Sequence, residues 1–182
     1  MAKIDEEIQL AAFHVGVEEY AIDIMRIREI LNPGQRSSPL RLVRVPKAPP
    51  FVDGVVSLRG TILPIIDMRK RFDVAPPEDG RTTRYVVVSM PVPGAPMRVV
   101  GLAVDRVSLI RIRRSEIKPP PEFSGLGGGN AEPYFAGVCS TGGRLIMILN
   151  IDRILTTAEK ISLGAAAEAG EGGAAGPPAG SS

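Results

Sequence analysis

The sequence predicts an all-β protein made of two similar β-barrel units, and two observations lead to this fold class. First, the run from Gly54 to Asp67 returns in degraded form from Gly137 to Asn150, at a constant offset of 83 positions. A repeat of this kind indicates repeated folding units. Second, the apolar segments are short and are separated by Gly and Pro residues, as in β-sandwiches and β-barrels. Short strands that occur in duplicate therefore predict two barrels.

The two copies of the repeat agree at positions that chance matching of apolar residues explains poorly. The matched glycine and polar positions are Gly54 with Gly137, Ser57 with Ser140, Gly60 with Gly143 and Asp67 with Asn150. At nearly the same offset, Ala21-Ile22-Asp23 reappears as Ala103-Val104-Asp105. The copies differ most where Leu58-Arg59 is replaced by Thr141-Gly142. Because the arginine is present in only one copy, we expect Arg59 to serve function and not the scaffold.

The first part of the chain predicts strands followed by a connector. Residues 8–17 form an apolar, strand-like run, and a turn at Gly16 leads into a second strand at residues 20–24. Between Ile24 and Leu31 the apolar spacing suits a helix, while the isoleucine content favours a strand. We therefore expect a short helical turn followed by a strand in this segment. Residues 32–50 are rich in proline and basic residues, which predicts a connector.

The first copy of the repeat predicts a hairpin that ends in a helical turn. Short β-rich segments at residues 55–58 and 62–66 meet at Arg59-Gly60. Asp67 follows the second segment and can cap a helical turn at residues 68–72, because its carboxylate accepts bonds from free N–H groups.

The second half of the chain predicts further strands and a terminal helix. Strands are expected at residues 85–90, 99–104 and 107–112, and at 145–149 after a turn at Gly142-Gly143. The prolines within residues 91–96 predict a hairpin loop that limits pairing. The prolines and glycines of residues 119–133 predict a flexible loop. Ile151, Ile154 and Leu155 indicate a helix that lies on the barrel.

The end of the chain has a different composition from the rest. It is rich in Ala, Gly, Glu, Pro and Ser and shows no apolar pattern. Such a segment cannot bury enough surface to offset the entropy lost on ordering. We therefore predict a folded domain over residues 7–162 and a disordered Ala/Gly-rich tail over residues 163–182.

The composition excludes several classes of protein. The net charge is +2, and eight aromatic residues without Trp leave little for base stacking, which argues against nucleic-acid binding. One cysteine, Cys139, excludes an internal disulfide and fits a reducing compartment; its apolar neighbours predict a buried structural thiol. The N-terminus has acids where a signal peptide has an apolar run, and no stretch reaches the length of a membrane span. We expect a cytoplasmic protein.

No catalytic constellation is visible in the sequence. One histidine and one cysteine cannot supply a metal site, and His14 lies in a predicted strand, where a partly buried structural role is expected. The carboxylates Asp67, Asp105 and Asp152 stand at the ends of apolar runs, where capping explains them. The sequence predicts a protein that works by binding, without cofactor or metal.

Several motifs occur in order from about residue 7 to residue 160. They are Phe13-His14-Val15-Gly16, Tyr20-Ala21-Ile22-Asp23-Ile24, Val45-Pro46, Phe51-Val52-Asp53-Gly54-Val55, Leu58-Arg59-Gly60, Pro64-Ile65-Ile66-Asp67, Val100-Gly101-Leu102-Ala103-Val104-Asp105-Arg106-Val107 and Gly143-Arg144-Leu145-Ile146. Each motif alone is weak, but the combination in this order is specific. On these residues the chain resembles the CheW family of chemotaxis coupling proteins.

The resemblance implies both a fold and a function. The fold it implies is two intertwined, five-stranded, SH3-like β-barrels with a short C-terminal helix. The function is that of a non-catalytic adaptor, which couples methyl-accepting chemoreceptors to a CheA-type histidine kinase. Such an adaptor is cytoplasmic and is recruited to chemoreceptor arrays.

The resemblance also implies two contact surfaces. Ile24, Ile27 and Val107 are implied to face the regulatory domain of the kinase, although apolar residues of this kind are also found as ordinary core. Arg59, together with Glu29, is implied in coupling receptors to the kinase; the alternative is an exposed arginine with no special role.

The matching glycines are implied to serve the backbone. Gly54 and Gly60 are expected to permit a special backbone conformation and to make no partner contact. Two departures from the family pattern are mild, Ser57 in place of Asn and Asn150 in place of Asp.

Two rival classes of protein do not fit the sequence. A barrel that binds a small ligand or an oligonucleotide needs a basic groove with exposed aromatic residues, and the sequence shows neither. A redox or metal-dependent enzyme needs ligands that the chain lacks.

Overall fold

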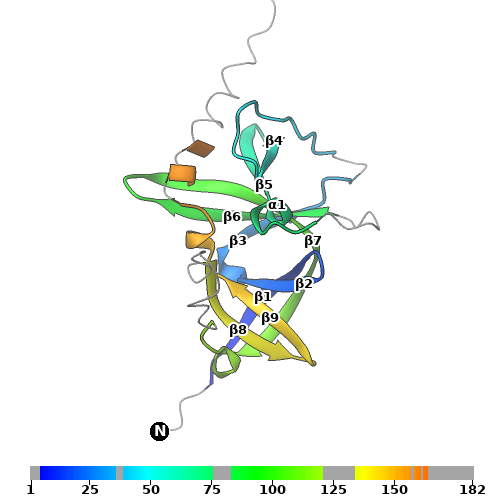
Figure 1. The fold of residues 1–182 in the computed structure, drawn as a ribbon, viewed down its shortest axis with the longest axis vertical. Helices are drawn as coiled ribbons and strands as arrows, with labels where there is room; N and C mark the ends of the chain where they lie inside the picture. The colour runs from blue at the N-terminus through cyan, green and yellow to red at the C-terminus, as the bar shows by residue number, and fades with distance from the viewer. Residues whose placement is uncertain are drawn as a thin grey trace, which may run out of the picture.

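The computed structural model describes residues 5–35, 39–75, 83–120, 134–156, 158–160 and 162–163. The predicted all-β fold class is confirmed (Figure 1). The strands are β1 (Glu7–Val15), β2 (Glu18–Asp23), β3 (Ile27–Leu31), β4 (Val52–Leu58), β5 (Thr61–Asp67), β6 (Thr83–Val92), β7 (Ala95–Arg113), β8 (Phe135–Thr141) and β9 (Arg144–Leu149). Short helical turns are η1 (Ile24–Arg26), α1 (Met68–Arg71), η2 (Arg114–Glu116) and η4 (Ile151–Arg153).

Two five-stranded units share the long strand β7. The first half of β7 pairs with β6 and β5, and these join β3 and β4 into the first unit. The second half of β7 pairs with β1, which continues through β2 and β9 to β8 in the second unit. In Figure 1, β4, β5 and β6 lie above and β8 and β9 below, with β7 running between them. The N-terminal strands thus belong to the same unit as the C-terminal hairpin, so the units are intertwined.

Strand β7 bends where it passes between the units. Asp105 pairs with Thr83 in the first unit and with His14 in the second. The next residue, Arg106, is skipped in the register with β1 and has a φ of 38°. A bulge of this kind re-aims a strand without interrupting it. The two strands expected at residues 99–104 and 107–112 are therefore one.

The internal repeat is present in three dimensions. Hairpins β4–β5 and β8–β9 are its two copies, and each has a register shift at the equivalent place, between Val52 and Gly54 and between Phe135 and Gly137. The second strand of each hairpin runs parallel to a strand from elsewhere in its unit, β5 to β7 and β9 to β2.

A close crossing of the backbone explains the repeated glycine. A Cβ atom on Gly54 would lie 2.4 Å from the carbonyl oxygen of Val43, which bridges to Val55. A Cβ atom on Gly137 would lie 2.8 Å from the carbonyl oxygen of Lys118 in the equivalent bridge. No side chain fits between the two segments at Gly54, which gives a physical reason for a glycine there, and its expected backbone role stays a prediction.

The turn after each hairpin is capped in the same way. Asp67 accepts a hydrogen bond of 2.9 Å from the backbone N–H of Arg69 and begins α1, as predicted. Asn150 accepts one of 3.1 Å from the N–H of Asp152 and begins η4. The side-chain oxygen that both residues carry is what the free N–H groups require.

Among the described residues, three hydrophobic clusters form the core. The largest includes Phe13, Ile22, Met68, Leu102 and Ile154, and it joins the two units. A second cluster around Leu10, Ala21, Cys139 and Ile146 fills the second unit, and a third around Val56, Leu63, Tyr85 and Val87 fills the first. Cys139 is buried, as predicted, and burial raises the pKa of its thiol, so this group stays protonated and unreactive.

The structure corrects three expectations. Residues 91–96 do form a hairpin between β6 and β7, but its pairing extends further than expected, because Val92 pairs with Ala95 across a tight turn; the register shift before Val92 accommodates Pro91. The helix expected from Ile151 starts as the short turn η4, and helical residues follow at 158–160 and 162–163. Leu163, assigned to the tail, is 2% exposed and packs in the largest cluster. The loop around 125–129 and the tail from 164 lie outside the described residues.

Candidate functional site

Arg59 stands in the two-residue turn between β4 and β5, in a backbone conformation that side chains rarely adopt. Its φ is 50°, and that of Gly60 is 82°. Two successive positive φ angles are typical of the type I′ hairpin turn, whose twist matches that of the strands. Glycine, asparagine and aspartate are the usual residues at the first position and glycine at the second, because most other side chains there cost about 1–2 kcal/mol.

The second copy of the repeat has glycine at both turn positions. Gly142 and Gly143 have φ angles of 56° and 74°, so the two turns share one conformation. Arg59 therefore carries a strain that its counterpart Gly142 avoids. Because the turn itself would be more stable with glycine, the arginine needs an explanation other than the fold.

The guanidinium of Arg59 forms a bidentate ion pair with Glu29 of β3. Nη1 and Nη2 donate to Oε1 and Oε2 respectively, each over 3.0 Å. The Arg59 side chain is 75% exposed and that of Glu29 is 28% exposed. The pairing fixes the direction of an arginine that still faces solvent, and its remaining donors stay available to a partner.

A cavity of about 290 Å3 lies beside this ion pair. Its lining comes from the end of β3, the connector, β4 and the β4–β5 turn, and includes Ile30, Leu31, Leu40, Leu58 and Arg59. The fold thus brings Arg59 and Glu29, which are 30 residues apart in sequence, into contact beside this cavity of the first unit.

A bulge in β3 separates Ile27 from Glu29. Ile27 lies opposite Val88 of β6, whereas Glu29 lies opposite Val87, so the register shifts between them. Val88 belongs to the cluster between the units and Val87 to the cluster inside the first unit. Because opposed residues of an antiparallel pair share a face, Ile27 and Glu29 point to opposite faces of the sheet.

The three apolar residues expected to contact a partner are all partly buried. Ile24 begins η1, Ile27 begins β3, and Val107 lies on β7 opposite Phe13 of β1. Ile27 and Val107 pack against the cluster between the units. Their side chains are therefore neither fully buried in the core nor fully exposed to solvent.

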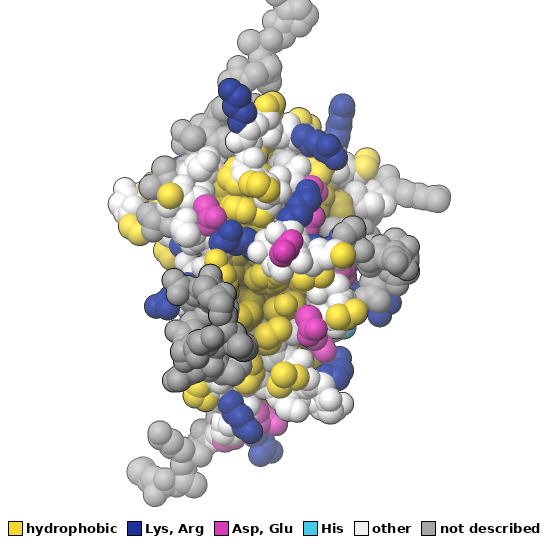
Figure 2. All heavy atoms as spheres, in the orientation of Figure 1, with side chains coloured by type: hydrophobic (Ala, Val, Ile, Leu, Met, Phe, Trp, Pro, Cys, Tyr) yellow, Lys and Arg dark blue, Asp and Glu magenta, His cyan; other side chains and the backbone are white. Residues whose placement is uncertain are grey.

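Sequence reasoning missed two exposed apolar residues near this trio. Met25 is 85% exposed and Leu109 is 55% exposed. Leu109 lies two residues after Val107 without a register shift, so both point to one face of β7. In the sequence, the apolar residues of the 107–112 segment fall on both faces of a strand, and this pattern indicated an exposed apolar side chain such as that of Leu109. No sequence pattern indicated that Met25 is exposed. Figure 2 shows hydrophobic side chains gathered in a hollow near the middle of one face of the molecule.

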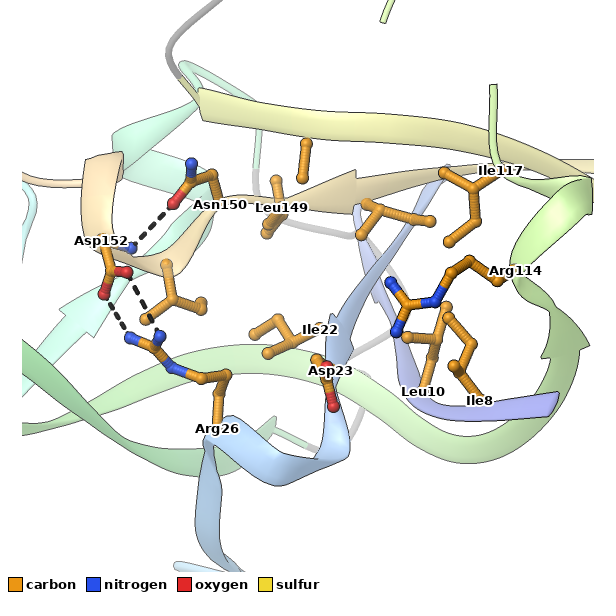
Figure 3. Close-up of a pocket in the computed structure, with 13 residues that line it drawn as sticks. Ile8, Leu10, Ile22, Asp23, Arg26, Arg114, Ile117, Leu149, Asn150 and Asp152 are labelled. Atoms are coloured by element: carbon orange, nitrogen blue, oxygen red, sulfur yellow. Dashed lines mark hydrogen bonds and ion pairs between the residues drawn. The ribbon is translucent and has the colours of Figure 1, made fainter. Parts of the chain in front are cut away.

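A larger groove, of about 530 Å3, opens on the second unit (Figure 3). Its lining is largely apolar and includes Ile8, Leu10 and Ile22. Arg26 and Asp152 stand together at one end and Arg114 at the other. None of the predicted contact residues lines it.

Neither a metal-ligand cluster nor a membrane-spanning helix occurs in the described part of the chain. No group of three His, Cys, Asp or Glu side chains there is placed to hold a metal ion. Within the same residues, no helix has the length and apolar character needed to cross a membrane. The histidine, His14, is partly buried in β1, as expected for a structural residue.

Comparison with known proteins decides the family. The model of the CheW-like domain matches residues 9–159. The chain belongs to the CheW family. The match begins in β1 and extends past η4, so the CheW-like domain includes both units and the shared strand β7.

Relatives agree along most of their length. The chemotaxis protein CheW of Helicobacter pylori is 35% identical over 152 residues, 83% of each chain. That of Klebsiella aerogenes is 33% identical over 81% of each chain, and the protein FrzA of Myxococcus xanthus is 30% identical over 87% of this chain and 92% of its own. As a CheW-family member, this protein is a chemotaxis adaptor.

A solved structure supports the fold. The scaffolding protein TtCheW from Thermoanaerobacter tengcongensis superposes with a TM-score of 0.68, at 24% identity, over 88% of this chain and 95% of its own. The agreement extends over both units, so the intertwined arrangement of the CheW-like domain is shared.

Proposed function

We propose that this protein couples methyl-accepting chemoreceptors to a CheA-type histidine kinase, as a non-catalytic adaptor in the cytoplasm that joins chemoreceptor arrays. Membership of the CheW family supports this function. Two surfaces with different chemistry, one apolar and one charged, suit a protein that must hold two partners at once.

The apolar surface is proposed to bind the regulatory domain of the kinase. Ile24, Ile27 and Val107 are its centre, and the exposed Met25 and Leu109 extend it. Partly buried apolar residues on a rigid sheet lose little entropy on binding, which makes them good anchors.

The charged surface is proposed to transmit the coupling between receptor and kinase. It consists of Arg59 and Glu29. One observation carries this assignment: Arg59 occupies a strained position where the repeat has glycine, yet its side chain is 75% exposed. A residue that costs stability and does not pack is expected to be retained for a contact with a partner.

The test uses receptor-containing membranes, purified CheA-type kinase and this protein. Wild-type protein should raise kinase activity far above the level without adaptor, and Arg59→Ala should not. Circular dichroism establishes that the variant is folded. Full stimulation by a folded Arg59→Ala variant would contradict the assignment of Arg59, and absence of stimulation by the wild type would contradict the coupling function itself.

A further inference from the structure

Arg26 lies inside the apolar segment that is proposed to bind the kinase, between Ile24 and Ile27. Its guanidinium points away from that segment toward η4 (Figure 3). Nη1 donates to Oδ2 of Asp152 over 3.2 Å, Nη2 pairs with the other carboxylate oxygen, and Nη2 also lies 3.4 Å from the carbonyl oxygen of Ser89. One side chain thus connects the segment to the C-terminal end of the second unit and to β6 of the first.

The first unit has an ion pair at the corresponding place. Arg69 of α1 forms a bidentate pair with Asp105 of β7, in which Nε donates over 3.2 Å. Arg69 and Asp152 are equivalent in the repeat, each two residues after the capping Asp67 or Asn150. In the first unit, the pair joins the turn after the hairpin to β7, the strand that runs parallel to β5. In the second unit, the pair joins the turn after the hairpin to η1, which follows β2, the strand that runs parallel to β9. The two pairs differ in that the charges are exchanged and in that Arg26 lies three residues beyond Asp23, which is the counterpart of Asp105 in the repeat.

The two ion pairs also differ in burial, which indicates different roles. Asp105 is fully buried and the Arg69 side chain is 16% exposed, so this pair belongs to the core. Arg26 and Asp152 are 37% and 38% exposed. A half-exposed pair contributes modestly to global stability, but it can still fix the direction of the chain that carries it.

Packing alone holds the Arg26 segment weakly. The turn η1 has three residues, none of which is buried, and Met25 in its centre is 85% exposed. The local contact is a cap, in which the N–H of Met25 donates to Asp23 over 2.9 Å. The bonds of Arg26 are the polar contacts by which the described residues of η1 reach distant parts of the chain.

We propose that Arg26 and Asp152 form a positioning pair, which holds Ile24, Met25 and Ile27 in the arrangement that the kinase regulatory domain recognises. This inference rests on the proposed kinase-binding surface. Neither charged residue need touch the kinase. Without the pair, η1 rearranges more freely and the apolar anchors must be ordered at the moment of binding, which lowers affinity.

The test is a double-mutant cycle on binding to the isolated regulatory domain of the cognate kinase, measured by calorimetry. Arg26→Ala and Asp152→Ala should each weaken binding by about fivefold, the upper end of what such a pair contributes. The double variant should lose no more than either single one, because both remove the same interaction. The exchange of charges in Arg26→Asp/Asp152→Arg should restore part of the affinity.

Arg144→Ala is the matched control. Arg144 of β9 donates to Glu19 of β2 over 3.1 Å, so this ion pair joins β2 and β9, the strands that lead into η1 and η4, at the end that lies away from η1. The control should lose thermal stability at least as much as Arg26→Ala and yet bind the kinase domain with wild-type affinity.

Three outcomes would overturn the proposal. Binding by Arg26→Ala within twofold of the wild type would show that the pair does not position the surface. An equal loss in Arg144→Ala would show a general effect of weakened β2–β9 pairing. If the wild type itself fails to bind the kinase domain, the proposed function fails, and the positioning role fails with it.

Discussion

Replacing Arg59 by glycine separates the scaffold from the function at one position. The change copies the sequence of the second hairpin, where Gly142 occupies the same turn position at nearly the same φ. It removes the guanidinium and its bonds to Glu29 and leaves a residue that suits the turn better than the original. We expect a protein that folds normally and does not couple receptors to the kinase.

The stability effects nearly cancel. Relief of the left-handed strain is worth about 1–2 kcal/mol, and the extra freedom of glycine in the unfolded chain costs about 0.4–1 kcal/mol. Loss of the ion pair costs about 0.2–1 kcal/mol, because the Arg59 side chain is 75% exposed. The net change therefore lies between a loss of about 1 kcal/mol and a gain of about 1.4 kcal/mol, and each 1 kcal/mol shifts Tm by about 2–4 °C for a chain of this size.

The assay compares thermal unfolding with receptor-stimulated kinase activity in reconstituted membranes. Arg59→Gly should keep its Tm within the stated range and give kinase activity close to the level without adaptor. Arg59→Ala, which keeps the strain and loses the pair, should be slightly less stable and equally inactive. Glu29→Gln tests whether the anchor of the arginine is needed in addition to the arginine itself. Full coupling by Arg59→Gly would refute the reasoning, because the strained arginine would then have no function.

Three further predictions concern the surface, the glycines and the chain end. Ile27→Glu should weaken the complex with the kinase regulatory domain by about 2 kcal/mol or more, since a charge would be buried without a partner; unchanged affinity of a folded variant would remove Ile27 from the interface. Gly54→Ala and Gly137→Ala should each destabilise the fold by about 1–3 kcal/mol in urea unfolding, because the new methyl group meets a backbone carbonyl; a neutral effect at either site would show that the crossing segment can move. Deletion of residues 164–182 should leave Tm nearly unchanged, whereas deletion from Leu163 should lower it by several degrees, because that side chain is core; equal Tm values for both truncations would contradict the packing of Leu163.

Much of the fold could be predicted because its signals are local. The β4–β5 turn, the Asp67 cap and the buried Cys139 each follow from a few adjacent residues whose backbone preference or polarity leaves little choice. The repeat adds to these local signals, because Gly54 and Gly137 stand at equivalent places where two backbone segments come close together. Arg59 and Ile27 could be selected as candidate residues from the sequence, but the residues that they contact in the fold could not be predicted from it.

The sequence by itself determined the fold class, the duplicated hairpins and the position of the one asymmetric arginine. The tertiary structure alone decided that β7 runs unbroken through both units, that Arg59 reaches Glu29, and that a bulge turns Ile27 and Glu29 to opposite faces. The physical reason is that turns and caps depend on the dihedral preferences of neighbouring residues. Strand register and long-range pairs depend instead on the burial of apolar surface summed over the whole chain, which no short segment encodes.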